Sequence, residues 1–164
     1  MTPSKLPQII VTPLLDRLRD EFNAAFFYKA AENWCKNAGY NNAAAYFAKE
    51  YHDELSHAQG IQDYLIQWNI IPQLPSIPKP TIEFNGLVDI IDQAYILEYA
   101  LYGDYNTVSK KAFESDPSVF DFLAKYRAVQ TASVAEYSDF KNSLALINSS
   151  DKFQLFVWEK ENFK

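Results

Sequence analysis

The sequence predicts an all-α protein: a four-helix bundle with one long crossover and a short fifth helix at the C-terminus. Its 164 residues are 48% hydrophobic and include only 4 Gly, which is typical of one helical domain rather than a sheet with many turns. Between the breaks, apolar residues recur at steps of three and four, the period of a helix with one buried face. Four of the 8 prolines lie within residues 69–85, which cannot be helical and must connect two helical pairs.

Cap and turn signals set the boundaries of each element. Thr12–Pro13 and Asp116–Pro117 have the pattern of an N-cap followed by proline at the first helical position. Gly39 and the polar stretch 148–151 indicate helix ends. We take residues 1–164 as a single domain, with the bundle at about 12–147. The predicted helices span 12–38, 42–69, 86–115 and 117–147, with a short one near 151–160.

Connection lengths predict the topology. The short links after the first and third helices favour two antiparallel hairpins. The proline-rich segment can extend by ~3.1 Å per residue, or about 50 Å, which exceeds the ~40 Å length of a bundle helix. The third helix should therefore run parallel to the second.

Polar side chains interrupt the apolar faces at one level of this bundle. These side chains are Glu21, Glu54, His57, Glu98 and Gln130. Since a helix rises by ~1.5 Å per residue, each of the five lies roughly 12–19 Å from the same end of the bundle. Buried carboxylates cost many kcal/mol unless they are protonated or bind a cation. The basic residues near this level are His57 and Arg127, too few to neutralise three carboxylates, so a metal site is favoured over a buried polar network.

The residue types indicate which metal. Carboxylates with one imidazole suit iron or manganese. Glu54 and His57 are three residues apart, which places both on one helix face. The pattern Glu-x-x-His alone is weak, and the prediction depends on its combination with the other three residues.

Three segments resemble the bacterial non-haem ferritins. Residues 18–35 (LRDEFNAAFFYKAAENWC) resemble the first helix of that family, residues 43–65 the second and residues 116–130 the start of the fourth. The resemblance covers nearly the whole chain and implies a ferritin-like fold with a dinuclear ferroxidase centre. It implies that Glu21, Glu54 and His57 hold the first iron, that Glu54 bridges, and that Glu98 holds the second.

The same resemblance assigns two further residues and a function. Gln130 is expected beside the second iron, and Tyr28 next to the centre, where it either contacts a ligand or fills core volume. The implied activity is oxidation of two Fe(II) by dioxygen or peroxide. The implied product is a ferric mineral stored inside a cytoplasmic cage of 24 subunits.

Residue counts separate the chain from related di-iron proteins. Both histidines, His52 and His57, fall in the second predicted helix, so Glu-x-x-His cannot repeat on two helices as in bacterioferritin and rubrerythrin. The sole methionine is Met1, so a haem ligated by methionine, as in bacterioferritin, is not expected. His52 lies about 140° around the helix from His57 and is expected at the surface. Cys35 is expected in the core.

Two features depart from the family pattern. Glu50, one turn before Glu54, is either a neighbour of the ligands or an additional metal ligand. Many bacterial ferritins hold a third iron between carboxylates of the second and fourth helices. In this chain Asp53 supplies the carboxylate of the second helix, but the corresponding fourth-helix residues, Val129, Ala132 and Ser133, are not anionic. Glu136, further along the fourth helix, could partly replace the missing carboxylate. We therefore expect two ordered irons per subunit.

Composition limits the remaining functions. A net charge of −6 and a pI near 4.9 without a basic cluster argue against a nucleic-acid partner. No apolar run reaches the ~18 residues of a membrane span, and the N-terminal apolar run is too short for a secretory signal, so we expect a cytoplasmic protein. A di-iron oxygenase acting on an organic substrate and a metal-free structural bundle remain alternatives.

Overall fold

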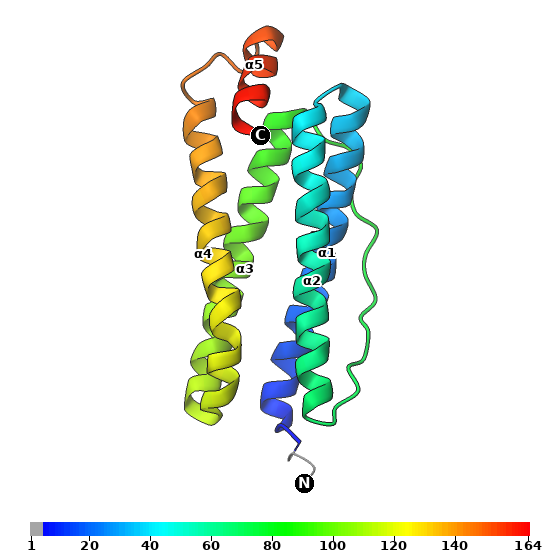
Figure 1. The fold of residues 1–164 in the computed structure, drawn as a ribbon, viewed down its shortest axis with the longest axis vertical. Helices are drawn as coiled ribbons and strands as arrows, with labels where there is room; N and C mark the ends of the chain where they lie inside the picture. The colour runs from blue at the N-terminus through cyan, green and yellow to red at the C-terminus, as the bar shows by residue number, and fades with distance from the viewer. Residues whose placement is uncertain (1–4) are drawn as a thin grey trace.

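The computed structural model describes residues 5–164, so Met1 lies outside the described part. Within the described residues, five helices follow one another: α1 (Gln8–Ala38), α2 (Asn41–Gln67), α3 (Leu87–Ser115), α4 (Pro117–Leu144) and α5 (Lys152–Asn162). In Figure 1, α1 and α2 form one antiparallel pair and α3 and α4 another. The segment between α2 and α3 runs back along the outside of the first pair, so α3 starts at the same end as α2 and runs parallel to it. The predicted four-helix bundle with one long crossover is confirmed.

The predicted start of α1 is wrong. The helix begins at Gln8, and Pro13 lies in its second turn rather than at its first position. The Pro7 carbonyl accepts hydrogen bonds from the backbone N–H groups of Ile10 (2.9 Å) and Val11 (3.1 Å). Pro13 removes one later bond of this kind because it has no N–H. Burial of Ile10 and Val11 against the bundle offsets that loss.

The other boundaries follow their local signals. The Asp116 carboxylate accepts a hydrogen bond from the Ser118 backbone N–H at 3.0 Å, and Pro117 is the first residue of α4, as predicted. Gly39 ends α1 in the left-handed region (φ 87°), which glycine adopts without steric cost. α2 ends two residues and α4 three residues before the predicted positions.

The core consists of two apolar clusters, one toward each end of the bundle. The first contains Tyr28, Phe47 and Tyr137 and reaches α5. The second contains Leu18, Ile61 and Tyr126 and reaches the start of α1. On α1, α2 and α4 the predicted polar residues lie between the members of these two clusters, and on α3 Glu98 lies near the end of the first cluster, before Leu101. The polar level therefore separates the two halves of the core.

α5 closes one end of the bundle. Trp158 and Phe163 are buried, and both rings pack against Phe140. The buried Glu159 carboxylate accepts a hydrogen bond from the Ala43 backbone N–H at 2.8 Å, which places a negative charge at the start of α2, where the helix dipole favours it. This contact ties the fifth helix to the second.

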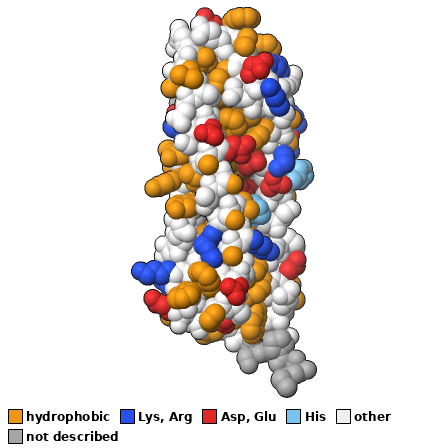
Figure 2. Space-filling view, turned by 60° about the vertical axis from the view of Figure 1, so that its left-hand side comes forward, with side chains coloured by type: hydrophobic (Ala, Val, Ile, Leu, Met, Phe, Trp, Pro, Cys, Tyr) orange, Lys and Arg blue, Asp and Glu red, His pale blue; other side chains and the backbone are white. Residues whose placement is uncertain are grey.

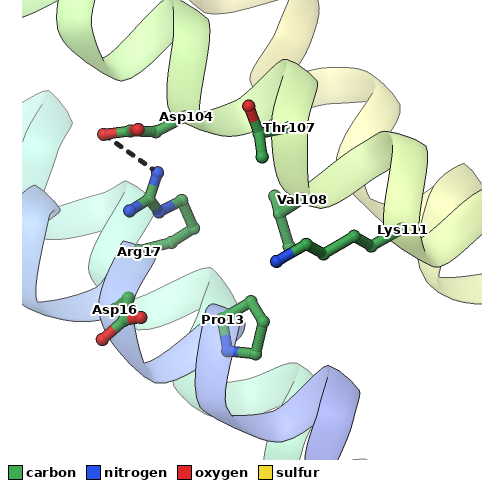
Figure 3. Close-up of a pocket in the computed structure, with 7 residues that line it drawn as sticks. All are labelled: Pro13, Asp16, Arg17, Asp104, Thr107, Val108 and Lys111. Carbon is green, nitrogen blue, oxygen red and sulfur yellow. Dashed lines mark ion pairs between the residues drawn. The ribbon is translucent and has the colours of Figure 1, made fainter.

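The surface is mixed in character. Figure 2 shows acidic side chains gathered about half-way along one face, close to histidine, with apolar side chains scattered above and below them. On another part of the surface, Arg17 of α1 forms ion pairs with Asp20 (2.7 Å) and with Asp104 of α3 (3.2 Å) beside a pocket of about 140 Å³ (Figure 3). Among residues 5–164, none of the helices combines the length and apolar character that a membrane crossing requires.

Candidate metal centre

The structure brings the five predicted polar residues together between the two apolar clusters. Glu21, Glu54, Glu98 and Gln130 are at most 3% exposed, and the His57 side chain is 22% exposed. They come from four different helices. None of these helices could bury such groups alone, since each relies on the other three to exclude water.

Two groups of three side chains could each hold a cation. Glu21, Glu54 and His57 offer ligand atoms that all lie within 4.8 Å of one another, and so do Glu50, Glu54 and Glu98. His57 Nδ1 lies 3.0 Å from Glu54 Oε2 and 3.5 Å from Glu21 Oε2. Glu54 belongs to both groups. The arrangement can therefore hold two cations with one carboxylate between them.

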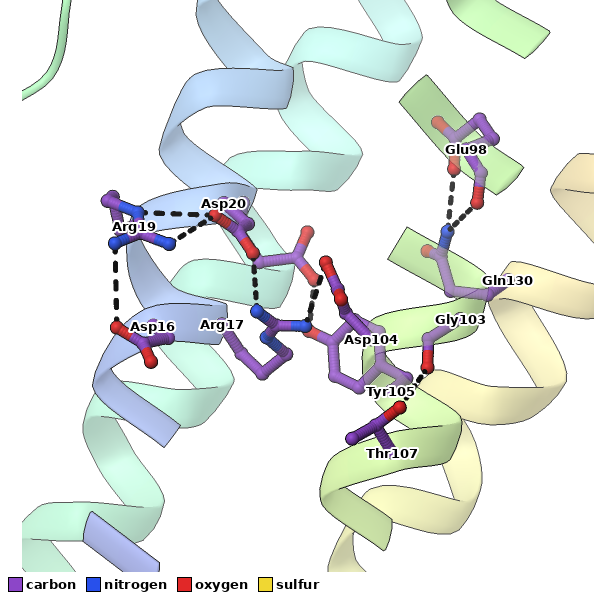
Figure 4. A network of polar contacts seen from close by, with 11 residues as sticks. Asp16, Arg17, Arg19, Asp20, Glu98, Gly103, Asp104, Tyr105, Thr107 and Gln130 are labelled. Carbon is purple, nitrogen blue, oxygen red and sulfur yellow. Dashed lines mark hydrogen bonds and ion pairs between the residues drawn. The ribbon is translucent and has the colours of Figure 1, made fainter. Parts of the chain in front are cut away.

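Hydrogen bonds distinguish the two outer carboxylates. Glu21 Oε1 accepts a hydrogen bond from the Tyr105 hydroxyl, while Glu21 Oε2 has no hydrogen-bond partner among the described residues. Glu98 Oε1 accepts one from the Tyr28 hydroxyl, and Glu98 Oε2 accepts one from Gln130 Nε2 at 2.7 Å (Figure 4). The first group thus keeps an open oxygen, whereas both oxygens of Glu98 already have donors.

Electrostatics show how the centre accommodates its charge without a cation. Burial raises the pKa of Glu54 well above its ordinary value, and the nearby Glu21 raises it further. Burial also acts to raise the pKa of Glu21, but the neighbouring Glu54 and His57 side chains leave that pKa below its ordinary value. Burial lowers the pKa of His57, yet Glu21 leaves it raised. Metal binding must therefore displace the proton that the raised pKa of Glu54 favours, because metal ligands must be deprotonated.

Glu50 is half-buried and completes the second group. Burial and the charges of Glu98 and Glu136 raise its pKa to about 7. Burial also raises the pKa of Glu98 itself. Three carboxylates with raised pKa values around one point are typical of a site that is built to bind positive charge.

Other residues singled out from the sequence lie elsewhere. Arg127 donates to Ser109 Oγ at 2.8 Å and to the Phe120 carbonyl, so it does not neutralise the centre. His52 is exposed, and Cys35 is fully buried, both as expected. Asp53 forms an ion pair with Lys49 at 2.6 Å.

The fourth-helix residues considered for a third iron differ in exposure. Val129 and Ala132 are exposed and Ser133 is half-buried, while Glu136 is exposed.

Tyr105 is the contact that sequence reasoning missed. It lies on α3 and is fully buried. Its position seven residues after Glu98 places it two turns along the same face. That spacing could have indicated a hydroxyl at the level of Glu21.

A bundle of this topology with a buried carboxylate and histidine centre defines a class of helical metal-binding proteins. The chain belongs to the ferritin-like domain family, which matches residues 12–147. The predicted resemblance to bacterial non-haem ferritins is confirmed.

Individual relatives are distant in sequence but similar in length. A probable bacterial non-heme ferritin-like protein of Haemophilus influenzae is 25% identical over 157 residues, which cover 95% of this chain and 94% of that protein. A bacterial non-heme ferritin of Escherichia coli O6:H1 is 22% identical over 149 residues, or 88% and 90% of the two chains. The open pore ferritin of Archaeoglobus fulgidus superposes with a TM-score of 0.90 at 21% identity and covers 98% and 99%. This last likeness demonstrates the shared fold.

Proposed function

We propose that this chain is a single ferritin-like domain that stores iron and oxidises Fe(II) before storage. The observation that carries the proposal is the sharing of Glu54 between two groups of ligands in an otherwise apolar core. The names of the relatives, bacterial non-heme ferritins, point to the same activity.

Each residue has a role in this proposal. Glu21, Glu54 and His57 bind the first Fe(II), and Glu54, Glu98 and Glu50 bind the second. Gln130 and Tyr28 hold the Glu98 carboxylate through their hydrogen bonds. Carboxylates favour the more highly charged Fe(III), because Coulomb attraction in a buried site grows with the charge of the ion.

The electron balance is simple. Each Fe(II) gives up one electron, and dioxygen takes both electrons and two protons to form hydrogen peroxide. Where peroxide is the oxidant, two electrons and two protons convert it to two waters. The Fe(III) product leaves for a mineral inside a cage of identical subunits.

The alternatives receive less support. An oxygenase needs an organic substrate, and the relatives are ferritins by name. A metal-free bundle would leave Glu54 and Glu98 buried without cations, at a cost that the described polar contacts only partly offset.

Aerobic addition of Fe(II) tests the proposal. We expect rapid oxidation of about two Fe(II) per subunit, followed by slower growth of a mineral that co-elutes with the protein. Glu54→Ala should abolish the rapid phase while keeping the helical fold, since it removes a carboxylate from a crowded buried site. Glu114→Ala, an exposed carboxylate of α3, is the matched control. A rapid phase that survives in Glu54→Ala would contradict the proposal.

Crystals soaked briefly in Fe(II) test the number of ions. We expect two anomalous peaks at the iron edge, with the second position less occupied, because hydrogen bonds to both oxygens of Glu98 weaken this carboxylate as a metal ligand. A well-occupied third peak beside Asp53 would contradict the two-ion assignment.

A further inference from the structure

Tyr105 determines which oxygen of Glu21 faces the first metal position. Its ring is fully buried, and its hydroxyl donates a hydrogen bond to Glu21 Oε1. The other oxygen, Glu21 Oε2, faces His57 Nδ1 at 3.5 Å and accepts no hydrogen bond from the described residues. Tyr105 therefore hydrogen-bonds one carboxylate oxygen of Glu21 and leaves the other without a hydrogen-bond donor.

Tyr126 connects Tyr105 to the histidine. The two tyrosine rings stack with centroids 5.3 Å apart and planes 7° from parallel. The Tyr126 hydroxyl donates to the backbone carbonyl of His57 at 3.1 Å, and its ring meets the imidazole edge-on at 5.9 Å. One stacked pair thus contacts Glu21 on α1 and His57 on α2, two of the three groups around the first position.

Gly60 makes the second of these contacts sterically possible. A Cβ atom at residue 60 would lie 2.4 Å from the Tyr126 hydroxyl oxygen, closer than atoms can approach. The glycine costs helix stability in the middle of α2, and its effect is to let the hydroxyl reach the backbone of His57. The Arg17 guanidinium lies 5.9 Å from the Tyr105 ring centroid and is held by Asp20 and Asp104 (Figure 4). The fully buried Tyr105 ring is therefore close to both Tyr126 and Arg17.

We propose that Tyr105 and Tyr126 form a positioning pair that presents one oxygen of Glu21, together with His57, to the first metal position. The inference rests on the proposed function, since it assumes that this position binds a metal. Groups that hydrogen-bond to metal ligands fix ligand orientation, and their loss typically lowers metal affinity by 10–100-fold. Without Tyr105, both oxygens of Glu21 are free, and a carboxylate with two free oxygens can bind one cation through both. The pair therefore sets both the affinity and the coordination number of the first position.

Anaerobic titration of the metal-free protein with Co²⁺ tests the pair without iron chemistry. Tyr105→Phe removes the donor to Glu21, and Gly60→Ala displaces the Tyr126 hydroxyl without altering any proposed ligand. We expect both variants to bind the Co²⁺ ion of higher affinity about 10–100-fold more weakly than the wild type does. In Tyr105→Phe we also expect weaker visible absorption from that Co²⁺, because its coordination number rises when Glu21 binds through both oxygens.

Two substitutions of the same kinds serve as controls. Tyr99→Phe removes a hydroxyl from an exposed tyrosine of α3, and Gly103→Ala adds a methyl group where nothing lies within 4 Å. Both should match the wild type in affinity and spectrum. Circular dichroism verifies folding, and Gly60→Ala provides the test if Tyr105→Phe does not fold.

The outcomes separate the two levels of inference. If both variants bind the first Co²⁺ as tightly as the wild type with the same spectrum, the positioning role is wrong, while two bound Co²⁺ per wild-type subunit still support the proposed function. If the wild type itself binds no Co²⁺ at two positions, the proposed function fails. If Co²⁺ binding is weakened in Tyr105→Phe and Gly60→Ala but not in the two controls, the positioning role of Tyr105 and Tyr126 is supported.

Discussion

Glu50 makes this centre more acidic than the ligand set implied by the family resemblance. It lies one turn before Glu54 on α2, and its carboxylate lies within 4.8 Å of ligand atoms of Glu54 and Glu98. Gln130, in contrast, donates to Glu98 and therefore acts on the second position through another side chain. We therefore expect Glu50 rather than Gln130 to be a direct ligand, because a carboxylate is a stronger ligand for iron than an amide that already serves as a donor.

Removal of Glu50 should weaken one metal position and spare the other. We expect Glu50→Ala to lower the affinity of the second position by about 10-fold or more, with the first position unchanged, since Glu21 and His57 do not belong to the second group. Iron-edge anomalous peak heights in soaked crystals measure both positions separately. Glu136→Ala, which removes an exposed carboxylate near Glu50, is the control. An undiminished second peak in Glu50→Ala would show that Glu50 is not a ligand.

The raised pKa values predict how the metal-free protein responds to pH. The folded state holds a proton on Glu50 up to a pKa of about 7, whereas the unfolded chain releases it near 4.3. The folded state therefore binds more protons between these values, so stability falls as pH rises through this window. The raised pKa values of Glu54, Glu98 and His57 act in the same direction.

Thermal unfolding in the presence of a chelator measures this effect. We expect the Tm to fall by a few degrees from pH 6 to pH 8, since about 1 kcal/mol shifts the Tm of a protein of this size by ~2–4 °C. Glu50→Gln should flatten the dependence. Saturating Co²⁺ should reverse it, because the metal competes with protons for the same carboxylates. A Tm that rises with pH in the metal-free wild type would contradict the assigned pKa directions.

At the residue scale, the sequence predicted the side chains that meet but not the contacts between them. Helical periodicity and depth placed Glu21, Glu54, His57, Glu98 and Gln130 at one level, because rise per residue is a fixed property of the helix. The direction of each hydroxyl and carboxylate depends on rotamers that packing selects. The carboxylate oxygen that each hydroxyl reaches, Glu21 Oε1 for Tyr105 and Glu98 Oε1 for Tyr28, could therefore be identified only in the folded chain.

At the element scale, capping residues gave the most accurate boundaries. Asp116 begins α4 where the sequence indicated, because its carboxylate accepts the Ser118 N–H and Pro117 is already fixed in helical φ. Thr12–Pro13 has the same pattern in α1, but the helix begins at Gln8 instead. There the turn from Gln8 is held by the burial of Ile10 and Val11, a tertiary contribution that local signals do not contain.

The cap of α4 permits a direct test of its contribution. Asp116→Ala should destabilise the protein by about 1 kcal/mol, since the substitution leaves an N–H group of the first turn without its acceptor. Asp116→Asn keeps an acceptor oxygen and should stay close to the wild type. Thermal unfolding of the metal-free protein compares the two. Equal loss in both variants would mean that charge, rather than the hydrogen bond, dominates at this helix start.

At the scale of the whole molecule, the two faces of α5 have opposite character. One face is committed to the bundle through Trp158, Phe163 and the Glu159 contact with α2. The other face leaves Phe153 74%, Phe156 45% and Val157 41% exposed. An apolar patch at the end of a well-packed bundle is typical of a protein–protein contact, and a closed symmetric assembly is the usual way for copies of one chain to cover such a patch.

We expect this face to join subunits in the 24-subunit cage that the family resemblance implies, because it is too apolar for a free surface. Twenty-four copies of 18.9 kDa give about 450 kDa. Light scattering coupled to size exclusion in neutral buffer measures the mass, and a wild-type monomer or dimer would contradict the cage. The double substitution Phe153→Ser with Phe156→Ser should produce smaller species, because it removes most of the exposed apolar surface of α5 without touching its buried face. Ile96→Ser removes a similarly exposed apolar side chain from α3 and should leave the assembly intact. If both sets of substitutions dissociate it equally, the contact is not specific to α5.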